Sequence, residues 1–395
     1  MISVEEARQQ ILEGLQVTGR ETVPLAVSQG RVLAMPVAAR LSQPPADVSA
    51  MDGYAVRAAD AVQGAVLSII GEAPAGHPFG GSIGAGQAVR LFTGSFVPPG
   101  ADAILLQENA TAAEGAVTVN ESCTAGKHIR RAGQDFQLGA ELIAAGRRLT
   151  ARDVGLAAAG NHPWLQVHRR PRIAILATGD EISLPGEAIG PGGIVSSNAH
   201  MLASFVTAAG GDPVVLPIAG DDLAAIAAGA DAARGADLLV TTGGASVGVY
   251  DLVQPGLQAR GLALDFWKIA MRPGKPLMFG RLESQPLLGL PGNPVSAYVC
   301  AVLFLGPAIA RMSGLPAQPP ETERARLTAA MAANDRREDY VRARLERGEH
   351  GWLVTPFPVQ DSGMLSTLAR ADALIRRPAH QGALVAGAEV EILRF

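Results

Sequence analysis

The sequence predicts a multidomain protein of α/β and β type, in which a doubly wound parallel sheet is accompanied by smaller β-rich domains. Between residues 171 and 312, short apolar strands alternate with helical segments, a pattern typical of parallel βαβ units. From 53 to 138, and again after 320, short apolar runs are separated by glycine and proline clusters, which favours all-β domains. A length of 395 residues is consistent with about two to three domains.

Composition excludes several classes of protein. Hydrophobic residues make up 48% of the chain and charged residues 18%, so a sizeable core is available and global disorder is excluded. The net charge is −4 and there is no basic block, which argues against a general nucleic-acid binder. The two cysteines cannot form a disulfide framework, and the acidic N-terminus has no apolar stretch typical of a signal peptide. We therefore expect a cytoplasmic protein.

One apolar stretch raises the question of a membrane span. Residues 284–310 carry no charge and are long enough to cross a bilayer. Four prolines, three glycines and an asparagine interrupt the stretch, mostly in its first half. A loop followed by a buried helix is the better interpretation, so we expect no membrane partner.

The first half of the chain begins with an amphipathic helix over residues 3–19. Ser3 and Glu6 have the spacing of a capping box, and four apolar residues share one stripe of this helix. A proline- and serine-rich linker follows at 42–49, and a short helix is predicted at 151–160, where a glycine ends it. Two apolar runs between them, 65–70 and 103–106, are predicted strands.

The second half gives the clearest pattern. The segment 172–177, which is apolar after Arg172, predicts a buried strand, and a glycine pair closes the helix that follows it. The predicted strands are 172–177, 214–218 and 237–241, and the predicted helices are 199–209 and 222–233.

Distinctive residues follow these strands. Thr178-Gly-Asp-Glu181 follows the first, Gly220-Asp-Asp222 the second, and Thr241-Thr-Gly-Gly-Ala-Ser-Val-Gly248 the third, with Asp251 just beyond. Open α/β sheets bind ligands at the carboxyl ends of their strands, where consecutive glycines direct N–H groups at an anion and carboxylates hold Mg²⁺. Taken alone, each element could be a helix cap or a turn, but together they predict a site.

Two further segments support an anion site. Asn293 and Pro294 suit the N-cap and first turn of the apolar helix, where N–H groups bind phosphate, although an ordinary capped helix explains them equally well. Lys268, Arg272 and Lys275 place three cations within eight positions, which solvated surface residues also explain. The patterns of dinucleotide-binding, P-loop, zinc and serine-hydrolase sites were not found in the sequence.

The combination of motifs resembles the molybdopterin molybdotransferases, the MoeA family, which includes the C-terminal half of gephyrin. The resemblance covers nearly the whole chain. The motifs occur in one order: Ser49-Ala-Met-Asp-Gly-Tyr-Ala55, Thr178-Gly-Asp-Glu181, Ser197-Asn198, Gly243-Gly-Ala-Ser-Val-Gly248, Arg272-Pro-Gly-Lys-Pro276, Gly289-Leu-Pro-Gly-Asn-Pro-Val-Ser296 and Ser362-Gly-Met-Leu-Ser366.

The resemblance implies a reaction and an architecture. Molybdate is inserted into the dithiolene of adenylylated molybdopterin, the pyrophosphate is cleaved with Mg²⁺, and AMP leaves. Four domains are implied: an elongated domain from 1–45 plus 139–170, an inserted β domain at 46–138, an α/β domain at 171–315 and a C-terminal β domain at 316–395. A homodimer is implied, in which the β domain of one subunit covers the α/β site of the other, with an upstream molybdopterin adenylyltransferase as a candidate partner.

The resemblance also assigns roles to residues. The implied catalytic residues are Asp52, Thr93, Asp135, Glu181, Asp221 and Asp251, of which Glu181, Asp221 and Asp251 are the implied metal ligands. The implied substrate-binding residues are Gly243, Gly244, Ser246, Gly248, Lys268, Arg272, Lys275, Pro291, Asn293, Pro294, Arg342 and Ser362. Two positions depart from the family pattern, because Ser196 stands where aspartate is frequent and Arg272 where lysine is frequent.

Two other functions stay open at this stage. A molybdopterin adenylyltransferase would use ATP on the same α/β platform, although the additional domains count against it. A gephyrin-like scaffold would bind partner peptides without catalysis, but a scaffold has no need for the clustered carboxylates Asp52, Glu181, Asp221 and Asp251.

Overall fold

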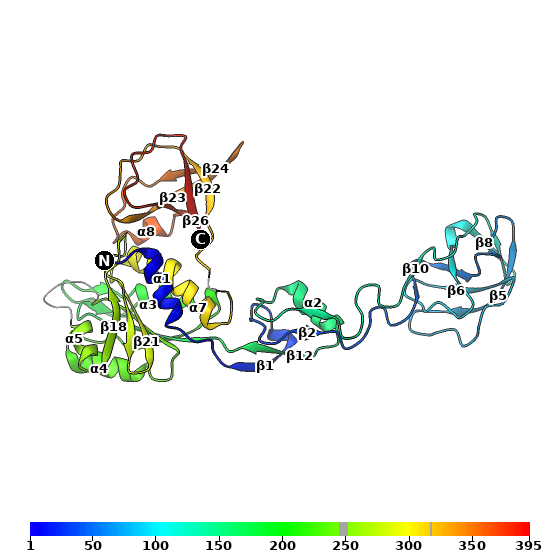
Figure 1. The fold of residues 1–395 in the computed structure, drawn as a ribbon, viewed down its shortest axis with the longest axis horizontal. Coiled ribbons are helices and arrows are strands. Elements are labelled where there is room, and N and C mark those ends of the chain that lie inside the picture. Colours follow the sequence, from blue (N-terminus) through cyan, green and yellow to red (C-terminus); the bar gives the residue numbers. More distant parts are fainter. Residues whose placement is uncertain (245–251, 317) are drawn as a thin grey trace. The chain divides into compact units, whose positions relative to one another are not determined.

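The computed structural model describes residues 1–244, 252–316 and 318–395, which form two compact units (Figure 1). The first unit comprises residues 1–21, 30–34 and 166–395, and the second comprises residues 22–29 and 35–165. The chain therefore passes between the two units more than once. The predicted four-domain division, which is finer than this, stays a prediction.

A six-stranded sheet forms the centre of the first unit, in the order β16-β13-β17-β21-β20-β18. The first four strands of that order are parallel, as the alternation of strands and helices predicts. β20 and β18 extend the sheet in antiparallel pairings, so it is mixed at one edge. The strands are β13 (Arg172–Ala177), β16 (Asp212–Val215), β17 (Leu238–Thr242), β18 (Leu262–Trp267), β20 (Met278–Leu282) and β21 (Gln285–Leu290).

Helices cover both faces of this sheet (Figure 1). Successive residues of a strand point to opposite faces, and in β13 the side chains of Ile173 and Ile175 pack with α1, α3, α6 and α7 while Ala174 and Leu176 pack with α4 and α5. This confirms the doubly wound architecture. The helices are α1 (Val4–Glu13), α3 (Asn198–Ala209), α4 (Leu223–Ala232), α5 (Val253–Gln258), α6 (Pro294–Cys300) and α7 (Gly306–Met312).

The predicted element boundaries are mostly correct within two residues. The N-terminal helix has the predicted capping box between Ser3 and Glu6, but it ends at Glu13 instead of residue 19. The predicted strand 214–218 lies at 212–215, because its pairing with β13 begins at Arg172 and Asp212. The structure thus shortens one element and shifts another, without changing their order.

The apolar segment after Pro294 forms one continuous helix. α6 passes through a π-helical stretch, Ala301–Leu305, into α7. The helix Pro294–Met312 is long and apolar enough to span a membrane, but 72% of its most apolar window is buried inside the protein. It is packed in the core together with α1 and the sheet, as the prediction of a buried helix requires.

The C-terminal part of the first unit is a small barrel. Its strands follow the order β23-β24-β22-β26-β25, and an additional pairing of β23 with β25 closes the ring. β19 (Met271–Arg272), from the α/β part, pairs with β23 and so joins the barrel to the loop that carries Arg272. The remaining elements are β14 (Ile182–Ser183), β15 (Ile194–Val195), β22 (Glu323–Leu327), β23 (Glu338–Gly348), β24 (Gly351–Pro356), α8 (Leu365–Leu368), β25 (Ala373–Arg377) and β26 (Glu389–Arg394).

The second unit contains a six-stranded sheet in the order β7-β4-β6-β5-β9-β8, as predicted for the inserted β region. Its strands are β4 (Gly53–Val56), β5 (Val66–Ala73), β6 (Gln87–Leu91), β7 (Ala103–Leu106), β8 (Ala110–Ala113) and β9 (Ala116–Val119). The second unit also contains one helix, four short strands and two 3₁₀ turns among its described residues. These are α2 (Ala151–Ala159), β2 (Val37–Ala38), β3 (Val48–Ser49), β10 (Ile129–Arg130), β11 (Glu141–Ile143), Leu25–Val27 and Gln107–Asn109. β1 (Arg20–Pro24) and β12 (Trp164–His168) run from residues of one unit into residues of the other.

Candidate functional site

A cleft of about 800 Å³ lies at the carboxyl ends of the parallel strands, where open α/β sheets bind their ligands. Its walls come from the segments that follow β13, β17 and β21, together with the start of α6 and a segment of the C-terminal barrel. Seven of the residues singled out from the sequence line it: Glu181, Asp221, Gly243, Gly244, Pro291, Asn293 and Pro294. The structure therefore brings the predicted edge motifs together around one cavity.

The glycine pair after β17 is required by close packing. Both residues have a positive φ, +100° at Gly243 and +58° at Gly244. A Cβ on Gly243 would lie 2.6 Å from the Thr178 carbonyl oxygen, and one on Gly244 would lie 2.1 Å from a methyl of Val253. Ser246, Gly248 and Asp251, which the sequence also assigned to this site, lie outside the described residues.

Two acidic loops are hydrogen-bonded to each other at one end of the cleft. The amide N–H of Asp221 donates to Oδ1 of Asp180 at 2.9 Å, and the amide N–H of Asp180 donates to Oδ2 of Asp221 at 3.4 Å. The neighbouring Glu181 carboxylate lies over Gly179, where an added Cβ would come within 2.6 Å of Oε2. These contacts hold the two acidic loops against each other.

Asp222 has a different role from Asp221. Its Oδ1 accepts the N–H groups of Ala224 and Ala225 and so caps α4. The helix-cap interpretation is therefore correct for Asp222, and Asp221 is left at the cleft. Within residues 1–244, 252–316 and 318–395, no three His, Cys, Asp or Glu side chains lie close enough to hold a metal ion.

The N-terminus of α6 is closed by a segment from the barrel. The amide N–H of Val295 donates to the Ser362 carbonyl oxygen at 3.1 Å, and Nδ2 of Asn293 donates to Ser362 Oγ at 3.0 Å. Asn293 occupies the N-cap position and Pro294 the first turn, but the Asn293 side chain does not cap the helix. The prediction of free N–H groups here is therefore wrong for Val295, because a backbone carbonyl already accepts its proton.

Asn198 lines the cleft, although the sequence analysis gave it only as part of a motif and assigned it no role. Its Nδ2 donates to the Gly292 carbonyl oxygen at 2.7 Å and to Thr242 Oγ1 at 2.9 Å, so it ties the loop after β21 to the end of β17. Its Oδ1, and Oγ1 of Thr178, are buried without a hydrogen-bond partner among the residues described. The sequence signal that could have identified Asn198 is its position at the start of the helix that follows the first predicted strand of the sheet.

The predicted basic segment lies beside the cleft, which Pro276 lines. Lys268 has a φ of +72°, and its Nζ lies 3.7 Å from the centroid of the Trp267 ring, a cation–π contact. The Lys275 side chain is exposed. Arg272 Nη2 donates to Asp335 Oδ2 at 2.7 Å, so the guanidinium that replaces the family's frequent lysine is already paired.

Carboxylates of the barrel surround Arg272. A hydrogen bond from the Arg337 guanidinium, with further contributions from the Arg337 backbone and the Arg272 charge, holds the pKa of Asp335 well below its usual range. Burial instead raises the pKa of Asp339, whose Oδ1 lies 3.8 Å from Arg272 Nε. An incoming anion therefore has to compete with Asp335 for Arg272.

Arg342 is buried rather than exposed to the cleft. Its side chain is among the largest fully buried in the protein, with 1% of the residue exposed. Nη1 donates to the Met364 carbonyl oxygen at 3.2 Å and Nη2 to the Asp361 carbonyl oxygen at 2.8 Å. In the structure this arginine holds a segment of the chain, and its implied role in substrate binding stays a prediction.

Three predicted residues lie in the second unit. Asp52 Oδ1 accepts the amide N–H of Thr93 at 2.7 Å and its hydroxyl at 2.8 Å. These two hydrogen bonds, aided by the charge of Arg90, lower the pKa of Asp52. Gly53 begins strand β4, so Asp52-Gly53 does not form a hairpin turn. A glycine is required at this position because a Cβ would lie 2.1 Å from the Leu105 carbonyl oxygen. Asp135 has an exposed side chain.

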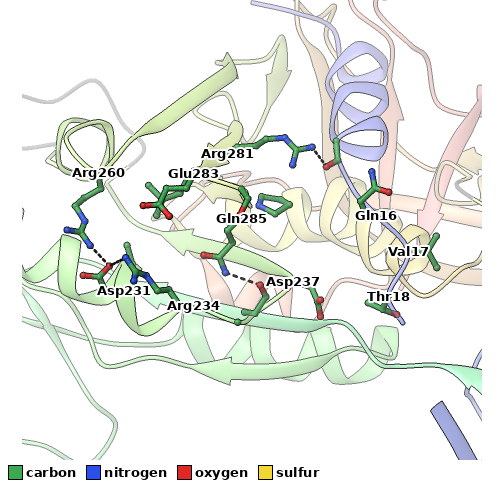
Figure 2. A pocket seen from close by; sticks show the side chains of 17 residues that line it. Gln16, Val17, Thr18, Asp231, Arg234, Asp237, Arg260, Arg281, Glu283 and Gln285 are labelled. Atoms are coloured by element: carbon green, nitrogen blue, oxygen red, sulfur yellow. Dashed lines mark hydrogen bonds and ion pairs between the residues drawn. The ribbon is translucent and has the colours of Figure 1, made fainter. Parts of the chain in front are cut away.

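A second cavity, of about 550 Å³, opens near the amino-terminal ends of β17 and β21 (Figure 2). Figure 2 shows Asp231 and Arg260 directed at each other, and Asp231 also pairs with Arg234 at 3.0 Å. Arg281 donates to the carbonyl oxygen of Gly14. Because these arginines have partners inside the protein, this cavity offers a weaker case for ligand binding than the carboxyl-end cleft.

Comparison with known families accounts for nearly the whole chain. Residues 2–160 match the "MoeA N-terminal region (domain I and II)". Residues 174–311 match a "Probable molybdopterin binding domain", and residues 324–395 match the "MoeA C-terminal region (domain IV)". The cleft lies almost wholly within the middle match.

Relatives of known name extend over the same length. "Molybdopterin molybdenumtransferase 2" of Mycobacterium tuberculosis is 36% identical over 404 residues, covering 99% of both chains. "Molybdopterin molybdenumtransferase" of Haemophilus influenzae is 33% identical and covers 100% of this chain and 99% of its own. A crystal structure of the MoeA protein from Pyrococcus horikoshii OT3 is 26% identical, covers 100% of both chains and has a TM-score of 0.86. The chain therefore belongs to the MoeA family of molybdopterin molybdenumtransferases.

Proposed function

We propose that this protein inserts molybdate into adenylylated molybdopterin, cleaves the pyrophosphate bond between the pterin and adenylate parts, and releases AMP. The observation that carries the proposal is the carboxyl-end cleft, which combines a glycine loop, acidic residues and a helix start. Its volume of about 800 Å³ suits a ligand as large as a nucleotide joined to a pterin. The family membership and the relatives' names support the same reaction.

The charges of the substrates explain why such a cleft is needed. Dithiolene, pyrophosphate and molybdate are all anionic and repel one another. Backbone N–H groups at the glycine pair Gly243-Gly244 and the cations Lys268, Arg272 and Lys275 would offset that repulsion. Arg272 is the residue we expect to exchange a carboxylate partner, Asp335, for an oxyanion of the substrate.

The acidic end of the cleft fits Mg²⁺. Glu181 and Asp221 supply carboxylate oxygens, the ligand type that Mg²⁺ prefers. We propose Asp251, outside the described residues, as the third ligand. When bound, the ion would neutralise charge that develops on the phosphate oxygens. Without it, the same carboxylates would repel the pyrophosphate, so their presence at a phosphate site is itself an argument for a cation.

The residues of the second unit complete the proposal. Asp52, held ionised by its two hydrogen bonds from Thr93, and Asp135 are proposed to act on the same substrate from a second copy of the chain. We therefore propose a homodimer, working in the cytoplasm and receiving substrate from a molybdopterin adenylyltransferase. Light scattering after size exclusion measures the mass, and a monomer at micromolar concentration would contradict this arrangement.

An AMP-release assay tests the proposed reaction. Purified protein is mixed with adenylylated molybdopterin and Mg²⁺, with and without molybdate, and AMP is measured by chromatography. We expect molybdate-dependent AMP release in the absence of ATP. Formation of adenylylated molybdopterin from ATP would instead identify an adenylyltransferase, and tight substrate binding without turnover would identify a scaffold.

A further inference from the structure

Arg90 connects two segments on either side of Asp52 in the second unit. It lies on β6 and is half-buried. One terminal guanidinium nitrogen, Nη1, donates to the Gly53 carbonyl oxygen at 3.2 Å, and the other, Nη2, donates to Gln107 Oε1 at 2.7 Å. Gly53 begins β4 and Gln107 begins the 3₁₀ turn after β7, so one side chain bridges the starts of two elements.

Two aromatic rings hold the Arg90 guanidinium in place. Tyr54 and Arg90 lie opposite each other in the antiparallel pairing of β4 with β6, so their side chains share one face of the sheet. Phe92 follows directly after β6. The Arg90 Cζ lies 5.0 Å from the centroid of the Tyr54 ring and 5.1 Å from that of the Phe92 ring, within the range of cation–π contacts. Because Tyr54 is buried, the guanidinium is anchored on a side chain of the core.

The segments that Arg90 bridges also hold Asp52. The Gln107 amide N–H donates to the Asp52 carbonyl oxygen at 3.3 Å. Asp52 Oδ1 accepts the amide N–H and the hydroxyl of Thr93, which lies three residues after Arg90. Gln107 therefore holds Asp52 through its backbone while Arg90 holds its side chain. A displacement of Gly53 or Gln107 would move the Asp52 carboxylate relative to Thr93.

Arg90 also places a positive charge next to Asp52. Hydrogen bonds from the backbone and side chain of Thr93 lower the pKa of Asp52, and the charge of Arg90 lowers it further. Two carboxylates lie on the adjoining elements: Glu72, in register with Arg90 on β5, and Glu108, on the 3₁₀ turn. Both are exposed. Arg90 thus opposes protonation of Asp52 in surroundings that also contain negative charge.

We propose that Arg90 is a positioning residue, which fixes the Asp52 carboxylate against Thr93 and does not itself contact the substrate. It acts by bridging Gly53 and Gln107. The inference rests on the proposed function, because Asp52 acts on the substrate only within that proposal. The alternative is a direct contact, in which the Arg90 guanidinium binds an oxyanion of the substrate.

Measurements on the substrate-free protein test the positioning itself. Arg90→Met keeps an unbranched side chain and removes the donors and the charge, and Arg152→Met, at an exposed arginine of α2 in the same unit, is the matched control. We expect hydrogen exchange at the Thr93 amide to rise roughly 3- to 10-fold in Arg90→Met, the range for one hydrogen bond. Because the charge that lowers the pKa of Asp52 is lost, the carboxyl-carbon NMR titration of Asp52 should move to higher pH. The control should leave both unchanged, and an unchanged exchange or titration in Arg90→Met would overturn the proposal.

Two milder variants separate the bridge from the charge, and they cover the case in which Arg90→Met does not fold. Arg90→Lys keeps the charge, but an ammonium on a flexible stem cannot hold two acceptors with a planar fork. Gln107→Leu removes the acceptor of Arg90 Nη2 and leaves the backbone N–H that donates to Asp52. We expect exchange at the Thr93 amide to rise about 2- to 5-fold in both variants. Wild-type exchange in either variant would overturn the proposal.

Kinetics distinguish positioning from direct contact. If Arg90 acts through Asp52, Arg90→Met lowers kcat/KM for adenylylated molybdopterin about 10-fold. The acidic limb of the kcat/KM pH profile then moves to higher pH, in step with the Asp52 titration, because this profile reports groups of the free enzyme. A raised KM in Arg90→Met with an unchanged pH profile would indicate direct contact and overturn the proposal. The exchange and titration experiments need no turnover, so failure of the positioning is distinguishable from failure of the proposed reaction.

Discussion

Replacing Asn198 tests whether the loop after β21 must be held in place for the cleft to function. Nδ2 of Asn198 donates to the Gly292 carbonyl oxygen and to Thr242 Oγ1, at 2.7 and 2.9 Å. Asn198→Ala removes both hydrogen bonds. Each contributes about 0.5–1.5 kcal/mol net, so together they contribute about 2 kcal/mol.

The expected effect on the reaction follows from this sum. A loss of about 2 kcal/mol that falls on substrate positioning lowers kcat/KM roughly 30-fold. The measurement is the initial rate of AMP release at saturating molybdate, as a function of adenylylated molybdopterin concentration. His200→Ala, at an exposed position of the same helix, is the matched control and should leave kcat/KM unchanged.

Asn198→Asp makes the test sharper. The shape of the side chain is kept, but a charged oxygen replaces the N–H₂ group opposite the Gly292 carbonyl oxygen. Repulsion between the two oxygens should make the loss at least as large as in Asn198→Ala. Wild-type kcat/KM in Asn198→Asp would refute the reasoning, because the variant cannot make either hydrogen bond as a donor.

Four further predictions concern the remaining groups. Thr93→Val removes a hydrogen bond that lowers the pKa of Asp52. Because a lowered pKa keeps the carboxylate ionised to more acidic pH, we expect the carboxyl-carbon NMR titration of Asp52 to move to higher pH in Thr93→Val. The control Thr93→Ser keeps the hydroxyl and should leave this titration in place. Gly243→Ala adds a Cβ 2.6 Å from a carbonyl oxygen, so it should lower kcat/KM at least about 10-fold, whereas Gly155→Ala, in open space on a helix, should preserve it. Excess chelator should abolish AMP release and added Mg²⁺ should restore it; full release in chelator would exclude the proposed ion. Asp52→Ala and Glu181→Ala should each be nearly inactive, yet mixed dimers should regain about half the activity by symmetry, and no recovery in confirmed heterodimers would exclude a shared site.

The α/β architecture and the carboxyl-end cleft could be predicted from the sequence because both depend on local patterns. An apolar run such as 173–177 indicates a strand buried on both faces, and parallel strands bring their carboxyl ends to one edge. Asp221 and Gly243 could therefore be placed together although they lie in different loops. The antiparallel edge strands could not be predicted this way, because their pairing depends on tertiary context.

The barrel's contribution to the cleft was beyond sequence reasoning. Ser362 lies 69 residues from Asn293, and no periodic pattern links two such positions. For this reason the sequence could not show that the Val295 amide, at the α6 N-terminus, already has a carbonyl partner. Likewise, an arginine on a strand usually indicates a solvated position, and only the structure reveals that Arg342 is buried against two carbonyls.

The central claim is that this chain couples molybdenum insertion to AMP release. The most direct test measures both products in one reaction: AMP by chromatography, and pterin-bound molybdenum by mass spectrometry after removal of free molybdate. The account predicts one molybdenum inserted for each AMP released, with no ATP present. AMP release without bound molybdenum, or insertion without AMP release, would contradict it.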